Sequence, residues 1–401
     1  MIKMVRFLHA ADLHLDSPFK GLSDLPNHLV KMIRNSTFEA FNNMITYAIE
    51  QQVDMVLIVG DIYDGENRSL QAQKYFVDGM QRLQKANIRA VISYGNHDHL
   101  GGKWVRFSLP SNVDVLGNEV ETKKLHINDE IIYIHGFSYP ERHIKKKMIE
   151  EYPVAQQNGL HIGMLHGSLA GDESHDVYAP FTKQSLLNKK YHYWALGHIH
   201  KRQILHETPP IIYPGNIQSR HRKEQGEKGF YDVHLQDDEC HYQFIRADVV
   251  RYEQVVMDGT SIRYANDVTA ICHKALQTVR SQGAAIVELR ITNLTEEGHA
   301  LWQQTSHMEW LALLRESEAD ETPMVWVASV TCDAPKEALT KASEQVLALI
   351  DDWDEERWQE VLGELYQQAN VTRFLPQYQT IQIDEMKAQV KETFLQTMRN
   401  K

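Results

Sequence analysis

The chain has 401 residues, and its 42 Lys and Arg stand against 54 Asp and Glu, a formal net charge of −12. At about 100–200 residues per domain this length predicts two or three domains. The composition, 42% hydrophobic and 24% charged, is that of an ordinary globular protein, and no apolar run reaches the roughly 18–20 residues of a membrane span.

We expect a cytoplasmic protein without a membrane anchor. The N-terminal stretch lacks the uninterrupted apolar segment of a signal peptide. The three cysteines, Cys240, Cys272 and Cys332, are widely spaced and fit no metal-binding pattern. We therefore expect them to be reduced thiols.

From residue 5 to about residue 246, short apolar segments with the character of strands are interleaved at first with amphipathic helices. The predicted strands are 5–10, 54–59, 89–94, 131–136, 161–166, 193–196, 210–214, 229–235 and 241–246. The predicted helices are 27–51 and 69–86. Helix–strand alternation followed by strands without helices predicts an α/β fold of mixed sheets packed face to face, with helices outside.

A boundary falls near residues 247–255, and the segment beyond it is predicted to be a small α+β unit. Its strands are expected at 255–259, 285–292 and 324–332, and its helices at 266–282 and 300–316. From about residue 335 the chain is helical and polar, with a break at 374–380 and a last amphipathic segment at 384–399. We therefore divide the chain into domains at 1–250, 251–334 and 335–401.

The charge is unevenly shared between these parts. Residues 1–250 carry 28 basic and 30 acidic side chains and 18 of the 21 histidines, whereas residues 251–401 carry 14 basic and 24 acidic side chains. The acidic excess therefore belongs to the C-terminal part, and the whole-chain charge does not exclude a nucleic-acid partner for the N-terminal part.

Five clusters of acidic, amide and imidazole side chains each follow a predicted strand. They are Asp12-Leu-His14, Gly60-Asp61-Ile-Tyr-Asp64, Asn96-His97-Asp98-His99, His166-Gly-Ser and Gly197-His198-Ile-His200. One such pair alone is more often a coincidence, but open sheets gather their binding groups at the carboxyl ends of strands, so five clusters predict one shared crevice.

The chemistry of these side chains predicts a metal centre. Imidazole and carboxylate ligands together suit Mn, Fe or Zn, and the absence of cysteine from these clusters argues against a structural thiolate zinc site. Seven ligands are too many for one ion with open positions. Two ions about 3.5–4 Å apart that share one carboxylate fit better, and such a pair suits phosphoryl transfer.

In this order the five clusters resemble the signatures of the calcineurin-like metallophosphoesterases over about residues 5–246. The resemblance implies a four-layer αββα sandwich and a dinuclear site, usually with manganese. Carried over, one ion would be held by Asp12, His14, Asp61 and His200. The other would be held by Asp61, Asn96, His166 and His198.

The resemblance also assigns roles beside the metal ligands. His97 would be the catalytic histidine that protonates the leaving oxygen or stabilises charge on the phosphoryl group. Asp64 would hydrogen-bond His97 and fix its tautomer. We expect Asp98 to hold its loop by hydrogen bonds and His99 to be solvated.

The opening sequence, the motif spacing and the appended α+β unit resemble one branch of this family, the bacterial DNA double-strand-break repair nuclease subunits of the SbcD and YhaO type. That branch implies DNA as substrate, a small domain that caps the nuclease site, and C-terminal helices that dock an SMC-like coiled-coil ABC ATPase. Where archaeal and eukaryotic relatives usually carry a histidine, this chain has Asp64, which weakens the expectation of processive exonuclease action.

Substrate and partner contacts are less sharply indicated. Arg220, His221 and Arg222 follow a predicted strand beside the site, and they are read either as contacts to a phosphate backbone or as a solvated basic loop. The apolar stripe beyond residue 335 fits packing on its own domain or docking of partner helices. A phosphoesterase for nucleotides or phosphoproteins, a non-catalytic DNA-tethering scaffold and a homodimer stay open as alternatives.

Overall fold

The computed structural model describes residues 4–17, 25–65, 68–102, 105–127, 129–171, 178–236, 239–333 and 341–354. Near the C-terminus it also describes residues 357–358, 360–361, 387–388 and 390–394. The expected break at 374–380 and most of the last amphipathic segment lie outside these ranges.

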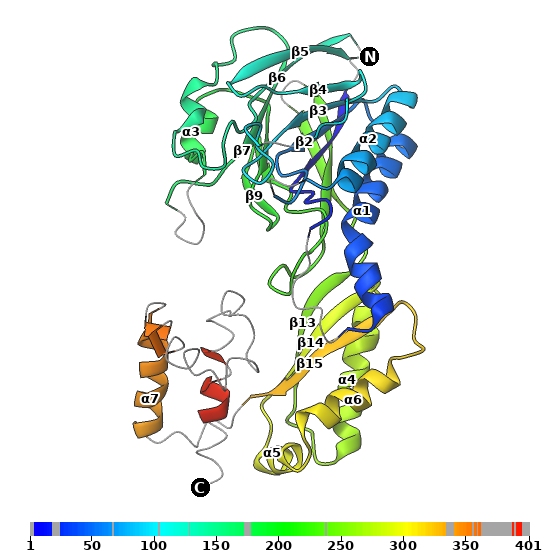
Figure 1. Cartoon of the computed structure of the whole chain (residues 1–401), viewed down its shortest axis with the longest axis vertical. Coiled ribbons are helices and arrows are strands. Elements are labelled where there is room, and N and C mark those ends of the chain that lie inside the picture. The colour runs from blue at the N-terminus through cyan, green and yellow to red at the C-terminus, as the bar shows by residue number, and fades with distance from the viewer. Residues whose placement is uncertain are drawn as a thin grey trace.

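Two six-stranded mixed sheets lie face to face in the N-terminal part (Figure 1). The first has, in spatial order, β12 (Glu239–Arg246), β11 (Gly229–Gln236), β1 (Val5–Ala11), β2 (Met55–Val59), β3 (Arg89–Ser93) and β4 (Val113–Val115). The second has β5 (Glu121–Ile127), β6 (Glu130–Gly136), β7 (Leu160–His166), β8 (Tyr193–Gly197), β10 (Pro210–Tyr213) and β9 (Gln203–Glu207).

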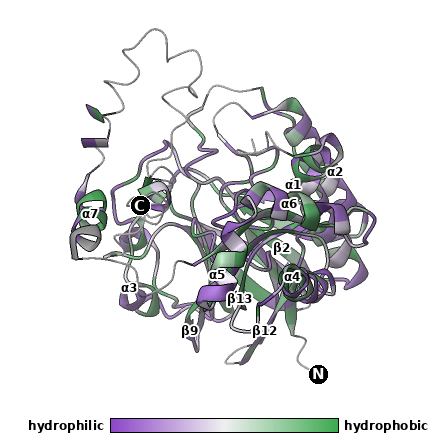
Figure 2. Cartoon of the chain, turned by 90° about the horizontal axis from the view of Figure 1, so that it is seen from below, coloured by the Kyte–Doolittle hydropathy of each residue, from purple (hydrophilic) through white to green (hydrophobic). Residues whose placement is uncertain are grey.

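The central strands form because they bury both of their faces. On β1, Leu8 packs toward the helices outside the first sheet, and its neighbour Phe7 packs between the two sheets. All five positions of β2 are buried and apolar, and apolar residues are the green ones in Figure 2. Near-continuous apolar runs of this kind are what parallel strands covered on both sides require.

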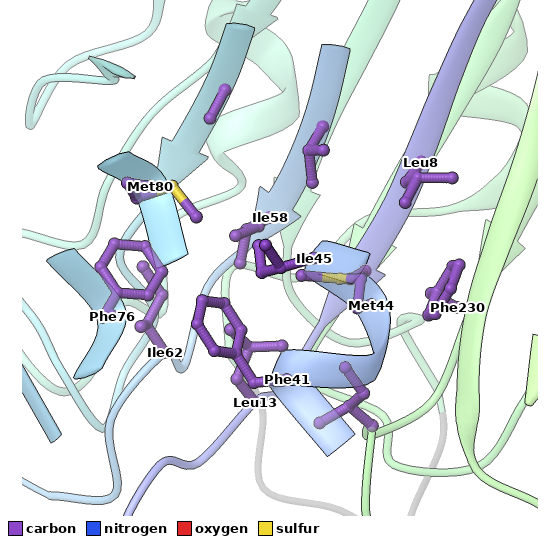
Figure 3. Packing of buried hydrophobic residues seen from close by; sticks show 14 of the residues in the cluster. Leu8, Leu13, Phe41, Met44, Ile45, Ile58, Ile62, Phe76, Met80 and Phe230 are labelled. Atoms are coloured by element: carbon purple, nitrogen blue, oxygen red, sulfur yellow. The ribbon is translucent and has the colours of Figure 1, made fainter. Parts of the chain in front are cut away.

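Helices α1 (Asn27–Glu50) and α2 (Leu70–Lys85) cover the outer face of the first sheet. Figure 3 shows Ile45 of α1 beside Ile58 of β2 and Phe76 of α2 beside Met80 and Ile62, all in one cluster. Ser69 caps the N-terminus of α2, because its hydroxyl accepts a hydrogen bond from the backbone N–H of Ala72.

The outer face of the second sheet carries a thinner layer. It consists of the short helix α3 (Lys183–Leu187), the 3₁₀ turn Met148–Glu151 and irregular segments. Their side chains, among them Tyr152 and Phe181, bury Trp194 of β8. The αββα sandwich predicted from the sequence is thus confirmed.

The α+β unit beyond residue 250 is a three-stranded parallel sheet with helices on one face (Figure 1). Its elements are β13 (Arg251–Asp258), β14 (Ala285–Thr292), β15 (Val325–Cys332), α4 (Ala265–Arg280), α5 (Glu296–Gln303) and α6 (His307–Ser317). The single helix expected at 300–316 is wrong, because Ser306 caps a new helix there with a capping box to Glu309.

The two parts touch through α1, whose N-terminal half extends beyond the first sheet. Ile33 of α1 packs against Val250, Tyr252 and Ile286, on the face of the small sheet opposite α4. A further helix, α7 (Lys341–Asp352), follows the small unit. In the described part of the chain, none of the helices is both long and apolar enough to span a membrane.

Three strands of the sandwich, β4, β5 and β9, were not predicted. Each lies at or beside a sheet edge and exposes part of its residues. Their polar and charged side chains therefore give no apolar run to detect.

Candidate metal centre

The five sequence clusters meet at one edge of the sandwich. In the first sheet the register pairs Ala11 with Val59 and Val59 with Ser93, so β1, β2 and β3 run parallel and end at the same level. In the second sheet His166, the last residue of β7, pairs with Gly197, the last residue of β8. Each cluster follows or completes one of these five strand ends.

One group of candidate ligands consists of Asp12, His14, Asp61 and His200. The Nε2 atoms of His14 and His200 are 3.1 Å apart. Asp12 Oδ1 lies 4.0 Å from His200 Nε2, and Asp61 Oδ2 lies 3.7 Å from His14 Nε2. The structure thus brings together the four side chains expected around one ion.

The second group consists of Asp61, Asn96, His166 and His198. His166 Nε2 lies 3.4 Å from Asp61 Oδ2 and 3.0 Å from Asn96 Oδ1. His198 Nδ1 lies 3.2 Å from the same Asn96 oxygen. Asp61 reaches both groups, as a shared carboxylate would.

A backbone contact orients the ring of His166 toward the second group. His166 Nδ1 lies 3.0 Å from the carbonyl oxygen of Val59 and donates to it, so Nε2 is the nitrogen that faces the two oxygens of the second group. Holding the other ring nitrogen in this way fixes the tautomer of a metal-binding histidine. The Nε2 atoms of His14 and His200 face each other at 3.1 Å, where both can serve as ligands of one cation when their protons are on Nδ1.

The charges at this edge also favour a cation. Burial raises the pKa of Asp12 to about 6, although His166 and His200 oppose the shift. Although burial lowers the pKa of His166, the carboxylates of Asp61 and Asp12 outweigh it and raise that pKa to about 9. Burial lowers the pKa of His14 to about 3, so its imidazole is neutral and can act as a ligand. The donor set therefore fits a pair of divalent ions.

Four of the candidate ligands have backbone conformations that side chains rarely adopt. The φ angles of Asp12, His14, Asp61 and His198 are 52°, 42°, 49° and 99°. Non-glycine residues at positive φ are uncommon, and they concentrate where the surrounding structure forces a functional geometry. Here Asp12 and His14 are held by backbone hydrogen bonds to Gly60 and Asp61.

Two glycines make room for the ligand side chains. A Cβ on Gly60 would lie 2.1 Å from His166 Nδ1, and a Cβ on Gly95 would lie 2.2 Å from Asp61 Oδ1. Only glycine allows the backbone to approach these side chains so closely.

His97 stands beside both groups, half-buried, while its neighbour Asn96 is buried. Its Nδ1 lies 3.1 Å from Asp64 Oδ1, and its backbone N–H donates to Asp61 Oδ1. Although burial opposes protonation, Asp64 and Asp61 raise the pKa of His97. The same Asp64 oxygen lies 3.4 Å from His14 Nδ1, so Asp64 contacts a proposed ligand as well as the proposed acid.

Asp98 holds its loop as expected, but the prediction for His99 is wrong. Asp98 accepts hydrogen bonds from the backbone N–H groups of Ile62 and Gly95, which ties two of the clusters together. His99 is only 8% exposed rather than solvated. The guanidinium of Arg68 donates to the carbonyl of His99 and thereby draws this residue inward.

The three predicted substrate-binding residues in the loop after β10 do not all face solvent. Arg220 turns inward, with Nη1 3.4 Å from Asp64 Oδ1 and Nη2 3.3 Å from His200 Nδ1. His221 and Arg222 are exposed, and Arg222 lies 3.4 Å from Glu288 of the small unit. Of the three, only His221 and Arg222 are open to solvent for contact with a phosphate backbone.

Glu224 is a site residue that the sequence did not reveal. It is buried, and its Oε1 lies 2.7 Å from His200 Nδ1. Although burial raises the pKa of Glu224, hydrogen bonding to His200 and the charges nearby lower it well below its usual range. A single Glu among basic residues, outside the five clusters, gives no signal in the sequence.

Comparison with known proteins identifies relatives of two kinds. Residues 5–202 match the family described as calcineurin-like phosphoesterase. The chain is 36% identical over 396 residues to the uncharacterized metallophosphoesterase YhaO of Bacillus subtilis, covering 98% of this chain and 97% of that protein. It is 26% identical to the DNA double-strand break repair protein Mre11 of Methanocaldococcus jannaschii, over 57% of this chain and 62% of that protein. A similar match, at 25% identity over 58% of this chain and 64% of the relative, links it to Mre11 of Thermoplasma acidophilum.

Proposed function

Because this chain belongs to the calcineurin-like phosphoesterase family, we propose that it is a manganese-dependent phosphodiesterase that cleaves DNA. The observation that carries the proposal is the convergence of seven donor side chains in two groups that share Asp61, with His97 beside them. When bound, a pair of divalent ions supplies Lewis-acid polarisation of a phosphoryl oxygen and a nucleophilic water.

The residues of the chain perform the remaining tasks. Asp64 holds Nδ1 of His97, so Nε2 is the ring nitrogen that can act on a substrate, and the His97 side chain is 32% exposed. From there His97 protonates the leaving oxygen or stabilises charge on the phosphoryl group. The buried ligands Asp12, Asp61 and His166 keep the metal side of the site away from bulk water.

DNA is favoured as the substrate by the relatives named as double-strand break repair proteins and by the exposed side chains of His221 and Arg222. One observation favours the alternative, a phosphoesterase for nucleotides or phosphoproteins. Arg220 is engaged with Asp64 and His200, and Arg222 with Glu288, so the loop offers DNA less free positive charge than its sequence promises.

The proposal also includes a protein partner. We expect an SMC-like coiled-coil ABC ATPase to bind the helices beyond residue 335, where Leu349 of α7 is 58% exposed. An exposed leucine on an amphipathic helix is the kind of contact that partner helices use. In the scaffold alternative the same helices would bind the ATPase without any cleavage.

The test is cleavage of end-labelled linear DNA in Mn²⁺, with p-nitrophenyl phosphate esters, mononucleotides and a phosphopeptide assayed in parallel. We expect the wild type to cut DNA and the His97→Ala variant to be inactive on it. His241→Ala, which changes an exposed histidine on β12, is the matched control and should cut normally. Turnover of the small esters without cleavage of DNA would contradict the DNA assignment, and no turnover at all would support the scaffold.

A further inference from the structure

We propose that Glu224 is a positioning residue: it fixes the tautomer and orientation of His200, and so sets the affinity of the ion held by Asp12, His14 and His200. This inference rests on the metal centre of the proposed function, and it concerns a residue outside the five sequence clusters.

The contact between Glu224 and His200 is short and largely withdrawn from water. Glu224 Oε1 lies 2.7 Å from His200 Nδ1, and the side chain of Glu224 is 7% exposed. A carboxylate only accepts hydrogen bonds, so Nδ1 of His200 must carry the proton. Nε2 of His200 then keeps its lone pair, and this is the atom that faces His14 Nε2.

Arg220 makes the carboxylate necessary. Its Nη2 lies 3.3 Å from the same His200 Nδ1, and an arginine only donates. If Glu224 were absent, Nδ1 would accept from Arg220 and the proton would move to Nε2. A protonated Nε2 cannot bind a metal, so the choice between Glu224 and Arg220 decides whether His200 is a ligand.

An amide cannot replace this carboxylate. Glu224 Oε2 accepts from Asn216 Nδ2 at 2.8 Å and from the backbone N–H of Arg220 at 2.7 Å. Both oxygens of Glu224 thus receive donors. A glutamine that turned its NH₂ group toward these two donors would set donor against donor. A glutamine that turned it toward His200 Nδ1 would make Nδ1 the acceptor and leave the proton on Nε2.

The alternative interpretation is that Glu224 only stabilises the conformation of its own loop. Two hydrogen bonds tie the loop to residues at the start of the small unit and just before it. Gln218 Nε2 donates to the carbonyl of Val250, and the N–H of Gly226 donates to the carbonyl of Tyr252. The side chain of Asn216 shares this bracing, because it donates to the carbonyl of Gln218 and to Glu224. The hydrogen bond between Asn216 and His200 joins only their backbones, so it is kept when the Asn216 side chain is removed. Variants of the Asn216 and Glu224 side chains therefore separate bracing from positioning.

The experiment is calorimetric titration of the full chain with Mn²⁺, comparing wild type with Glu224→Gln, Asn216→Ala and Glu227→Gln. Glu227 is an exposed glutamate in the same loop, which makes its variant the matched control. We expect E224Q to weaken one of the two binding events about 10–100-fold, the usual effect of losing the partner of a metal-binding histidine. The other event should stay within about threefold, and E227Q should keep both. N216A removes one donor to Glu224, so it should weaken the affected event less than E224Q does.

A conservative variant guards against loss of the fold. Glu224→Asp keeps the negative charge, so it should weaken the same event less than E224Q does. Wild-type affinities in E224Q would overturn the inference, and so would an equal loss in N216A, which would make Glu224 a loop brace. Wild-type protein that binds no Mn²⁺ would overturn the proposed function together with the inference, whereas the first two results would leave the function standing.

Discussion

Replacing Gly95 by alanine should remove metal from the site while leaving the rest of the sandwich intact. The new Cβ would lie 2.2 Å from Asp61 Oδ1 and 2.7 Å from His166 Nε2. To reach the ordinary contact distance of 3.4 Å, Asp61 Oδ1 would have to move by about 1.2 Å. Metal–ligand distances tolerate only about 0.2 Å, so we expect at least one ion to be lost.

The stability effect of the same substitution should be modest. Overpacking a filled interior by one methyl group costs about 1–3 kcal/mol, so the Gly95→Ala variant should still fold. Metal content by mass spectrometry after dialysis against Mn²⁺, and urea unfolding, measure the two effects. Gly117→Ala is the control, because the nearest atom to its Cβ would be Glu121 Oε1 at an ordinary 3.5 Å. Two ions bound with wild-type affinity in Gly95→Ala would refute the reasoning.

Other parts of the molecule give further predictions. Asp64→Asn should slow diester hydrolysis by about 10²-fold or more, because His97 loses the carboxylate at 3.1 Å that holds its tautomer; an unchanged rate would exclude the role of Asp64. Phe41→Ala should lower the free energy of unfolding by about 3–5 kcal/mol, because Phe41 is 1% exposed in the core under α1. The control is Phe107→Ala, which changes an exposed phenylalanine; equal losses of the two variants in urea titrations would contradict the prediction. Burial lowers the pKa of His9 to about 3 from 6.5, so the folded state binds fewer protons than the unfolded state between these values and stability falls as pH drops below 6.5. Between pH 7 and pH 5 the free energy of unfolding of His9→Gln should therefore fall by about 2 kcal/mol less than that of the wild type. Equal falls for the two proteins, measured by urea titration at both pH values, would show that His9 is not the group responsible.

Much of the sandwich and of the candidate ligand set could be predicted because both depend on local patterns. Buried parallel strands such as β2 leave continuous apolar runs, and each ligand cluster directly follows or completes such a run. Strand ends at a common level then bring residues as distant as His14 and His200 to 3.1 Å.

The remainder depends on contacts that no local pattern encodes. Arg220 could be recognised as basic, but its inward turn depends on the distant Asp64 and on His200. The burial of His99 depends on Arg68, which lies on a separate segment. Glu224 becomes meaningful only when the fold places it against His200.

We have proposed that seven side chains hold two ions and that His97 acts on the substrate without holding either. Measuring Mn²⁺ content and hydrolysis of bis-p-nitrophenyl phosphate on the same preparation of His97→Ala tests this most directly. We expect His97→Ala to hold two ions per chain, as the wild type does, with turnover reduced by about 10²–10⁴-fold. Loss of metal in His97→Ala, or wild-type turnover with both ions bound, would contradict it.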